Sequence, residues 1–276
     1  MEKIIVDLWK DNPPTISGLI GEEKIDATAA LEITNVTKAE LTIIRPVPKE
    51  NKGIAMIICP GGAYAGLAIT LQGYEFAEWL ASIGIVGIVL KYRMPNSHKE
   101  IPLDDLYKAI EYVHIHAMEL GVNLEKIGLV GFSAGEHLAA LASEYYNSDI
   151  RLRPKFSILF YPVITMGKYT HGDSLHNLLG THASDNDLDY YSCEKHVTKD
   201  VPPTLILVSD DDSLVSPINS ILHYKSLKQC NIPSAMYVFP SGDHAWGING
   251  KKAFGNTFKY SNMAKELIYD WLREFV

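Results

Sequence analysis

Three residues with a fixed spacing, Gly131, Ser133 and Gly135, form the pattern of a nucleophile elbow, a tight turn that raises a serine hydroxyl above a sheet edge. An apolar stretch precedes the turn, and a stretch rich in small residues follows it, as a buried strand and a helix would. The two glycines lack a Cβ, so strand and helix can close in around the serine. The N–H of Ala134 would lie at a helix N-terminus, where negative charge is favoured. We therefore predict Ser133 as a nucleophile and Ala134 as a donor to an oxyanion.

A serine hydroxyl is a poor nucleophile at neutral pH and needs a base within hydrogen-bond reach. His244 is the candidate base, because it lies in a Gly-x-His-x-x-Gly loop directly after the last predicted strand, 235–239. Such a loop can bring an imidazole over the sheet edge. Other histidines of the chain fall in loops or in the polar segment 163–201, and we expect them to be solvated or to line the substrate site: His98, His171, His176, His182 and His196.

The base needs an acid that fixes its tautomer and stabilises the imidazolium. Three aspartates in a row, Asp210, Asp211 and Asp212, follow the predicted strand 204–208. Asp212 is favoured, because Asp212 and Val215 have the Asp-x-x-Val register common in loops that supply such an acid. Asp211 remains the alternative. The neighbouring aspartates could hold the loop by accepting backbone N–H bonds.

An oxyanion needs at least two donors, and Ala134 supplies only one. The turn Pro60-Gly61-Gly62-Ala63 directly follows a predicted buried strand and is similar to the His-Gly-Gly-Gly loop of lipases and esterases. Gly62 and Ala63 align with the donor positions of that loop. Because Ala63 stands where a glycine is usual, we expect its φ to be negative or mildly strained.

Strands alternate with helices from about residue 53 onward, which predicts an α/β fold with a mostly parallel central sheet of about eight strands and helices on both faces. Function in such sheets gathers at the carboxyl ends of the strands. Residues 1–30 read as an extended arm with one edge strand, and residues 32–37 and 39–46 as a hairpin. We expect one domain, 1–276, with 163–201 as a small excursion over the active-site edge. Predicted buried strands lie at 53–59, 84–90, 127–131, 156–161, 204–208 and 235–239.

The composition narrows the function classes. The 276 residues are 47% hydrophobic and 21% charged, which is ordinary for a globular domain and argues against disorder. A net charge of −8 disfavours nucleic-acid and anionic-membrane partners. Three scattered cysteines predict neither a disulfide framework nor a metal site. The N-terminus lacks the apolar core of a signal peptide, and apolar runs are too short to span a bilayer, so a cytoplasmic protein is expected.

The chain resembles the esterase/lipase group of the α/β-hydrolases, in the carbohydrate-esterase-like branch of acetyl-xylan and feruloyl esterase-like "sugar hydrolases". The order Ser133, Asp212, His244 is that of the superfamily. The resemblance implies an α/β-hydrolase fold, no cofactor and no catalytic metal. Glu136 departs from a glycine common in the branch. The resemblance covers about 32–275 and rests on Cys59-Pro-Gly-Gly-Ala-Tyr64, Lys91-Tyr-Arg-Met-Pro95, Pro102-Leu-Asp-Asp105, Gly131-Phe-Ser-Ala-Gly135, His137-Leu-Ala-Ala140, Leu178-Leu-Gly180 and Gly242-Asp-His244.

These observations predict a serine carboxylester hydrolase that works through an acyl-enzyme. Its expected substrates are small acyl groups, such as acetyl, on a sugar or a similar alcohol. The expected partner is a small-molecule ester, with neither nucleic acid nor membrane, and a homo-oligomer is left open. Two other interpretations remain: a peptidase of the dipeptidyl- or oligopeptidase type, and a non-catalytic binding protein with a hydrolase fold.

Overall fold

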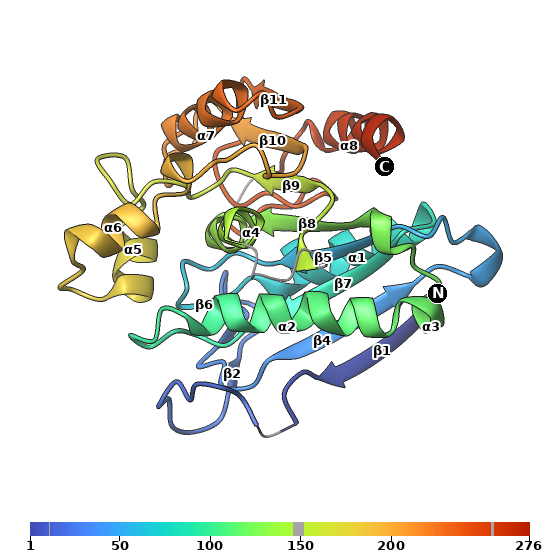
Figure 1. Ribbon diagram of the computed structural model, residues 1–276, viewed down its shortest axis with the longest axis horizontal. Coiled ribbons are helices and arrows are strands. Elements are labelled where there is room, and N and C mark those ends of the chain that lie inside the picture. The colour runs from blue at the N-terminus through green and yellow to red at the C-terminus, as the bar shows by residue number, and fades with distance from the viewer. Residues whose placement is uncertain (11, 146–151, 255–256) are drawn as a thin grey trace.

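The computed structural model describes residues 1–276 except 11, 146–151 and 255–256 (Figure 1). Its centre is an eight-stranded sheet in the order β1-β4-β7-β5-β8-β9-β10-β11. The pairs from β7 to β11 are parallel, and β1 and β4 add an antiparallel edge. The predicted fold class is confirmed. The strands are β1 (Glu2–Asp7), β4 (Glu40–Arg45), β5 (Ala55–Cys59), β7 (Val86–Lys91), β8 (Ile127–Phe132), β9 (Ser157–Phe160), β10 (Thr204–Ser209) and β11 (Ser234–Phe239).

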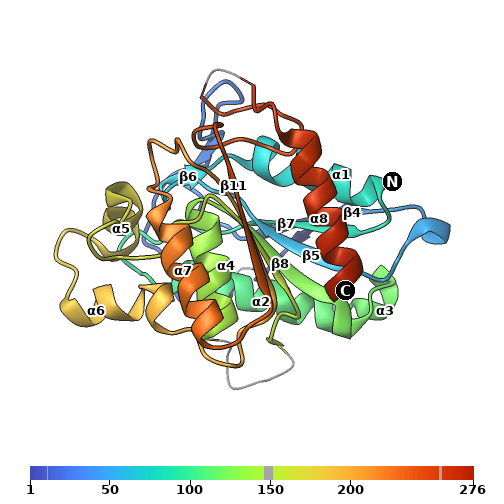
Figure 2. The ribbon, with the colours of Figure 1, turned by 90° about the horizontal axis from the view of Figure 1, so that it is seen from above.

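Helices cover both faces of this sheet. Figure 2 shows α1 and α8 on one side and α2, α4 and α7 on the other. The short helices α5 and α6 lie together at one end of the molecule, at the left in Figure 1. The α-helices are α1 (Glu75–Ser82), α2 (Ile101–Ile115), α3 (Ala117–Leu120), α4 (Ala134–Glu144), α5 (Gly172–Leu179), α6 (Asp185–Tyr190), α7 (Ile218–Gln229) and α8 (Ser261–Phe275). Shorter helical turns are η1 (Pro48–Glu50), the π-helix η2 (Thr70–Tyr74), η3 (Leu124–Lys126) and η5 (Cys193–Lys195).

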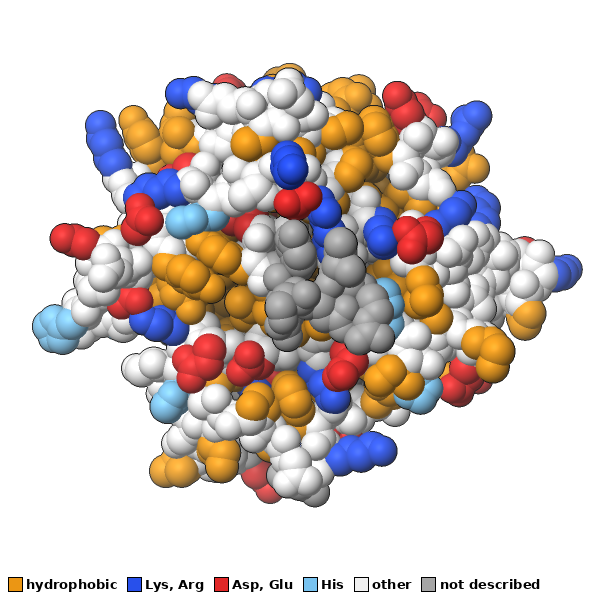
Figure 3. Space-filling view, viewed as in Figure 1, with side chains coloured by type: hydrophobic (Ala, Val, Ile, Leu, Met, Phe, Trp, Pro, Cys, Tyr) orange, Lys and Arg blue, Asp and Glu red, His pale blue; other side chains and the backbone are white. Residues whose placement is uncertain are grey.

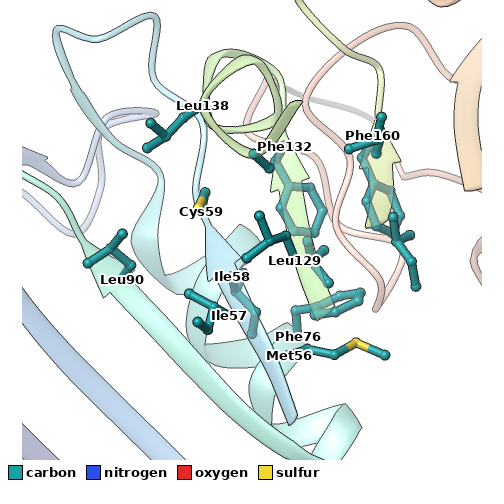
Figure 4. Close-up of a cluster of buried hydrophobic side chains, with 14 of the residues drawn as sticks. Met56, Ile57, Ile58, Cys59, Phe76, Leu90, Leu129, Phe132, Leu138 and Phe160 are labelled. Atoms are coloured by element: carbon teal, nitrogen blue, oxygen red, sulfur yellow. The ribbon is translucent and has the colours of Figure 1, made fainter. Parts of the chain in front are cut away.

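The central strands of the sheet are continuous apolar runs because helices bury both of their faces. Every residue of β5, β8, β9 and β10 is buried, as continuous apolar runs in a parallel sheet predict. Figure 4 shows part of the resulting core, where aromatic rings from α1 and two strands meet. Phe132 stacks on Phe160 with ring centroids 4.4 Å apart, and Phe76 meets Phe132 edge-on at 5.4 Å. The packing of these rings fixes the position of the C-terminal end of β8 and of the elbow that follows it.

The predicted hairpin of 32–37 with 39–46 is wrong. Two strands of that region belong to different sheets: β4 pairs with β1 and β7, whereas β3 (Ile33–Thr34) joins a small sheet with β2 (Lys24–Ile25) and β6 (Gly66–Leu67). Asn35 takes a φ of 54° directly after β3, so the chain turns away there. A Cβ on Gly66 would lie 2.6 Å from the carbonyl oxygen of Ile33. The small sheet therefore packs tightly beside the turn that follows β5.

The N-terminal arm is fixed by a buried ion pair between the loop after β7 and helix α2. The guanidinium of Arg93 lies 2.6 Å from the Asp105 carboxylate, and both side chains are buried. Trp9 donates its ring N–H to Asp105 at 2.6 Å, and Arg93 donates to the Thr15 carbonyl at 2.6 Å. Two of the sequence motifs, 91–95 and 102–105, therefore supply the two partners of one ion pair, and both partners bind the arm.

The distribution of charged side chains on the surface is consistent with the modest net charge. On the face in Figure 3, basic and acidic side chains are interspersed, and no large patch of one sign stands out. Among the described residues, no helix is both long enough and apolar enough to cross a membrane.

Candidate active site

The serine lies on a strained turn between β8 and α4. Ser133 has φ 54° and ψ −118°, a conformation that side-chain-bearing residues rarely adopt, and its N–H bonds to the Phe160 carbonyl of β9. A Cβ on Gly131 would lie 2.2 Å from Glu136 Cα, and one on Gly135 would lie 2.2 Å from the Cys59 carbonyl oxygen. Glycine is therefore required at both positions by close approach of helix and strand.

Three predicted residues from distant parts of the chain come together at the carboxyl edge of the sheet. The Oγ of Ser133 lies 2.8 Å from Nε2 of His244, and Nδ1 of His244 lies 2.7 Å from Oδ2 of Asp212. All three side chains are buried. Because a carboxylate only accepts, Nδ1 carries the proton and Nε2 is free to accept from the serine hydroxyl.

The two candidate acids have different partners. Asp212 uses its second oxygen, Oδ1, to accept the N–H groups of Leu214 at 3.0 Å and Val215 at 2.8 Å. Asp211 turns to the neighbouring loop and accepts the N–H of Asp243 at 2.7 Å. Thus Asp212 contacts the imidazole, while Asp211 holds the backbone next to it.

The predicted oxyanion residues lie on the turn after β5 and at the start of α4. Gly62 has φ 146°, and Ala63 has φ 53°, so Ala63 takes the strained alternative rather than a negative φ. In the described part of the chain, no hydrogen bond occupies the N–H groups of Gly62, Ala63 or Ala134. Asn177 of α5 donates to the Ala63 carbonyl at 2.9 Å, which fixes the turn from the opposite side.

A buried histidine on α4 supports the same turn. Tyr64, at φ 59°, places its hydroxyl 2.8 Å from Nδ1 of His137, and Nε2 of His137 lies 2.7 Å from the Tyr191 carbonyl. A carbonyl only accepts, so Nε2 carries the proton and Nδ1 accepts from Tyr64. Burial lowers the pKa of His137 to about 4, which keeps the ring neutral and this bonding pattern intact.

Two residues that sequence reasoning missed complete the polar surroundings. Gln72, on the π-helix η2, accepts the N–H of Gly61 at 2.6 Å and reaches the hydroxyl of Tyr161 at 3.3 Å. Tyr161 follows β9 and packs its ring against His244, with centroids 4.6 Å apart. A π-helix often marks a functional site, but no sequence pattern announces one, so only the structure could find Gln72.

A pocket of about 350 Å³ opens beside Ser133 and His244. One part of its wall comes from the arm before β3, including Leu31, and another from the segment 163–201, which contributes His171 and Asp173. The Nδ1 of His171 lies 2.8 Å from Ser174 Oγ. The pKa of His171 is lowered, first by burial and then by the nearby His244. The pocket thus has a mainly apolar lining with a few polar groups, as sites for small molecules do.

Glu136, the departure noted in the sequence, is fully buried in the first turn of α4. Neither carboxyl oxygen has a hydrogen-bond partner among the described residues. Burial, and then the carboxyl of Glu144, raise the pKa of Glu136 well above its usual value of 4.5. The neutral acid is therefore favoured. In the residues that the structure describes, no group of three or more His, Cys, Asp or Glu side chains could hold a metal ion.

Comparison with known proteins gives one family and several relatives. The BD-FAE family model matches residues 41–227, more than half of the chain. An acetylxylan esterase from Xylanibacter ruminicola is 33% identical over 88% of this chain and 50% of its own length. An endo-1,4-beta-xylanase B from Butyrivibrio fibrisolvens is 34% identical over 72% of this chain and 33% of its own. The chain therefore spans half or less of these two relatives.

Among solved structures, an acetyl ester-xyloside bifunctional hydrolase from Caldicellulosiruptor lactoaceticus superposes with a TM-score of 0.81 at 28% identity. That match covers 98% of this chain and 96% of the other. The elbow, the turn after β5 and the acid loop all fall within the matched range 41–227. The chain belongs to the BD-FAE family, in the carbohydrate-esterase-like branch of the α/β-hydrolases.

Proposed function

We propose that this protein is a serine carboxylester hydrolase, with Ser133 as nucleophile, His244 as general base and acid, and Asp212 as the orienting acid. The observation that carries the proposal is the continuous line of hydrogen bonds from Ser133 Oγ to His244 Nε2 and from His244 Nδ1 to Asp212, at 2.8 and 2.7 Å, on the wall of a pocket. A base within this reach can take the hydroxyl proton as the oxygen attacks.

The reaction proceeds in two halves. Ser133 Oγ attacks the ester carbonyl carbon and passes its proton to His244 Nε2, while the N–H groups of Gly62, Ala63 and Ala134 donate to the oxyanion. The C–O bond to the alcohol then breaks, and His244 returns the proton to the departing alcohol oxygen. In the second half, His244 takes a proton from water, the hydroxide attacks the acyl-enzyme, and the acid leaves as Ser133 regains its proton.

Small acyl esters of a sugar or a similar alcohol are the proposed substrates. The departing alcohol must receive its proton from His244, so it lies on the flank of the pocket beside that ring. His171 and Asp173 line the same pocket as His244. A nitrogen donor and a carboxylate acceptor suit hydroxyl groups. The names of the two relatives, an acetylxylan esterase and a xylanase, support the same class.

The test is hydrolysis of p-nitrophenyl acetate by the wild type beside Ser133→Ala, with fluorophosphonate labelling of the folded protein. We expect turnover and labelling in the wild type and neither in the variant. A variant that kept wild-type turnover would exclude Ser133 as the nucleophile. A series of p-nitrophenyl esters with longer acyl chains and a panel of acetylated sugars then test the acyl and alcohol preferences separately.

A further inference from the structure

A buried chain of hydrogen bonds runs from the turn after β5, on the wall of the pocket, to the loop that holds His244. It starts at Gln72, which is 2% exposed and sits in the π-helix η2. The side-chain oxygen of Gln72 accepts the N–H of Gly61 at 2.6 Å, and its nitrogen lies 3.3 Å from the hydroxyl of Tyr161. The Tyr161 hydroxyl in turn lies 2.5 Å from the carbonyl oxygen of Trp246.

The direction of every bond in this chain is determined. The carbonyl of Trp246 can only accept, so Tyr161 donates to it, and the phenol oxygen must accept from Gln72. The N–H of Gly61 can only donate, so the amide oxygen of Gln72 must face it. Burial raises the pKa of Tyr161 well above its usual value of 10.0, which keeps the phenol protonated as a donor. One orientation of each group therefore satisfies all of the partners.

The two ends of this chain are the two parts of the site that must keep a fixed separation. Gly61 directly precedes the predicted oxyanion donors, and a Cβ built on it would lie 3.0 Å from Ser133 Cβ. Because Gln72 occupies the N–H of Gly61, the next two N–H groups, of Gly62 and Ala63, are the ones left to donate. Trp246 lies two residues after His244, and the Tyr161 ring packs on the imidazole at 4.6 Å.

We propose that Gln72 is a positioning residue that, through Tyr161, holds the oxyanion donors at a set distance from His244. The inference rests on the proposed function, because only an oxyanion and a base need this separation. Donors stabilise a developing charge best when they are held in place before the reaction, and small displacements of such groups are costly. Gln72 also lines the pocket, but its side-chain hydrogen bonds among the described residues go to Gly61 and Tyr161 and not to Ser133 or His244. Its proposed effect on the reaction is therefore indirect.

The experiment uses Gln72→Met, Tyr161→Phe and the double variant, each of which removes a link of the chain while keeping the volume nearly unchanged. On p-nitrophenyl acetate we expect kcat to fall on the order of ten- to a hundredfold, with KM within about twofold of wild type. A trifluoromethyl ketone, which forms a tetrahedral adduct with the serine, should bind more weakly by the same factor as kcat/KM falls. The double variant should be no worse than the poorer single variant, because both substitutions cut one chain.

Ser143→Ala is the matched control, since it also removes a buried hydroxyl, one bonded to Ala139 and Ser157 away from the pocket. It should lower the melting temperature without moving kcat or inhibitor affinity. If Gln72→Met does not fold, Tyr161→Phe alone decides. Folded variants with wild-type kcat, additive losses, or a fall in kcat without weaker inhibitor binding would each overturn the positioning role.

Two measurements, the activity of Ser133→Ala and the labelling rate, distinguish a failure of the positioning role of Gln72 from a failure of the proposed function. If the wild type is labelled by a fluorophosphonate but does not cleave the ester, Gln72→Met should still slow labelling, and an unchanged rate overturns the inference. If Ser133→Ala cleaves the ester like wild type, or if the wild type neither cleaves nor is labelled, the proposed function falls and the inference falls with it. An active wild type with an inactive Ser133→Ala and unaffected Gln72 variants overturns the inference alone.

Discussion

The carboxylate of Asp212 lies 2.7 Å from Nδ1 of His244, while the adjacent Asp211 accepts a backbone N–H of the same loop instead. We therefore expect Asp212→Asn to lower kcat on simple esters on the order of a thousandfold or more, since an amide at that position favours the wrong imidazole tautomer. Asp211→Asn should lower kcat by less than about tenfold, because it only weakens one loop contact. Steady-state kinetics of both variants decide between the two acids, and the reverse ranking would contradict the assignment.

The pH dependence of hydrolysis tests His244 as the base. An imidazolium cannot accept the serine proton, so catalysis by a histidine base predicts that kcat/KM on a simple ester falls towards acid pH. The measurement is a rate profile from pH 5 to 8, with circular dichroism at each pH to show that the fold persists. A flat profile over that range would count against His244.

His171 and Asp173 should affect the choice of alcohol and not the chemistry itself. In His171→Ala and Asp173→Ala we expect kcat/KM for an acetylated sugar to fall on the order of tenfold, because a hydroxyl loses its partner. Activity on p-nitrophenyl acetate, whose alcohol carries no free hydroxyl, should change by less than about twofold. Equal losses on both substrates would show that these residues support the reaction and not the alcohol.

The Arg93–Asp105 ion pair should contribute strongly to stability. Asp105→Asn leaves the buried guanidinium of Arg93 without its charged partner, so the free energy of unfolding should fall by about 3–5 kcal/mol. The matched control is Glu111→Gln, which removes the surface partner of Lys108 and should change stability by less than about 1 kcal/mol. Urea denaturation of both variants makes the comparison, and similar losses would contradict a special role for the buried pair.

Glu136 makes stability depend on pH in a predictable direction. Its pKa in the folded protein is raised well above 4.5, so the unfolded chain releases this proton first as pH rises. Below pH 4.5 the group is protonated in both states. Above it, the free energy of unfolding falls by up to about 1.4 kcal/mol per pH unit until the folded pKa is passed. Glu136→Gln should therefore gain stability relative to wild type as pH rises.

The measurement for Glu136 is denaturation of both proteins between pH 4 and 8. Taking the difference between variant and wild type cancels residues that titrate independently of Glu136, whereas its coupling with Glu144 stays in the difference. Glu78→Gln, at an exposed position on α1, should give a constant difference over the same range. A constant difference for Glu136→Gln as well would show that the carboxyl is not held neutral.

The sequence predicted those parts of the molecule whose residue types are dictated by local physics. Strands such as β5 and β10 appear as continuous apolar runs because both of their faces are buried. Gly131 and Gly135 were visible because no other residue fits where helix and strand approach so closely. The glycines and the apolar strand before them identified Ser133 as a candidate. His244 was then chosen because it lies in the loop directly after the last predicted strand.

The parts that sequence reasoning missed depend on contacts between distant segments. Residues 32–37 alternate like a hairpin strand, but β3, which lies within them, pairs with 24–25 and 66–67, and no local signal encodes that pairing. Gln72 looks like any polar residue at the start of a helix, and only the π-turn aims it at Gly61. Likewise, Arg93 and Asp105 were noted as motif residues, and their ion pair became apparent only in three dimensions.

The segment 163–201, between β9 and β10, contributes to the pocket wall, so its replacement is one way in which such a protein could acquire a new specificity. Its ends attach to neighbouring strands, so it could be exchanged for another insert without altering the sheet. However, it also supports the turn after β5 twice, through the Asn177 side chain on Ala63 and the Tyr191 carbonyl on His137. If the proposed function holds, an exchanged insert that keeps those two anchors should change the alcohol preference without lowering kcat. An insert that loses them should change the preference and lower kcat as well.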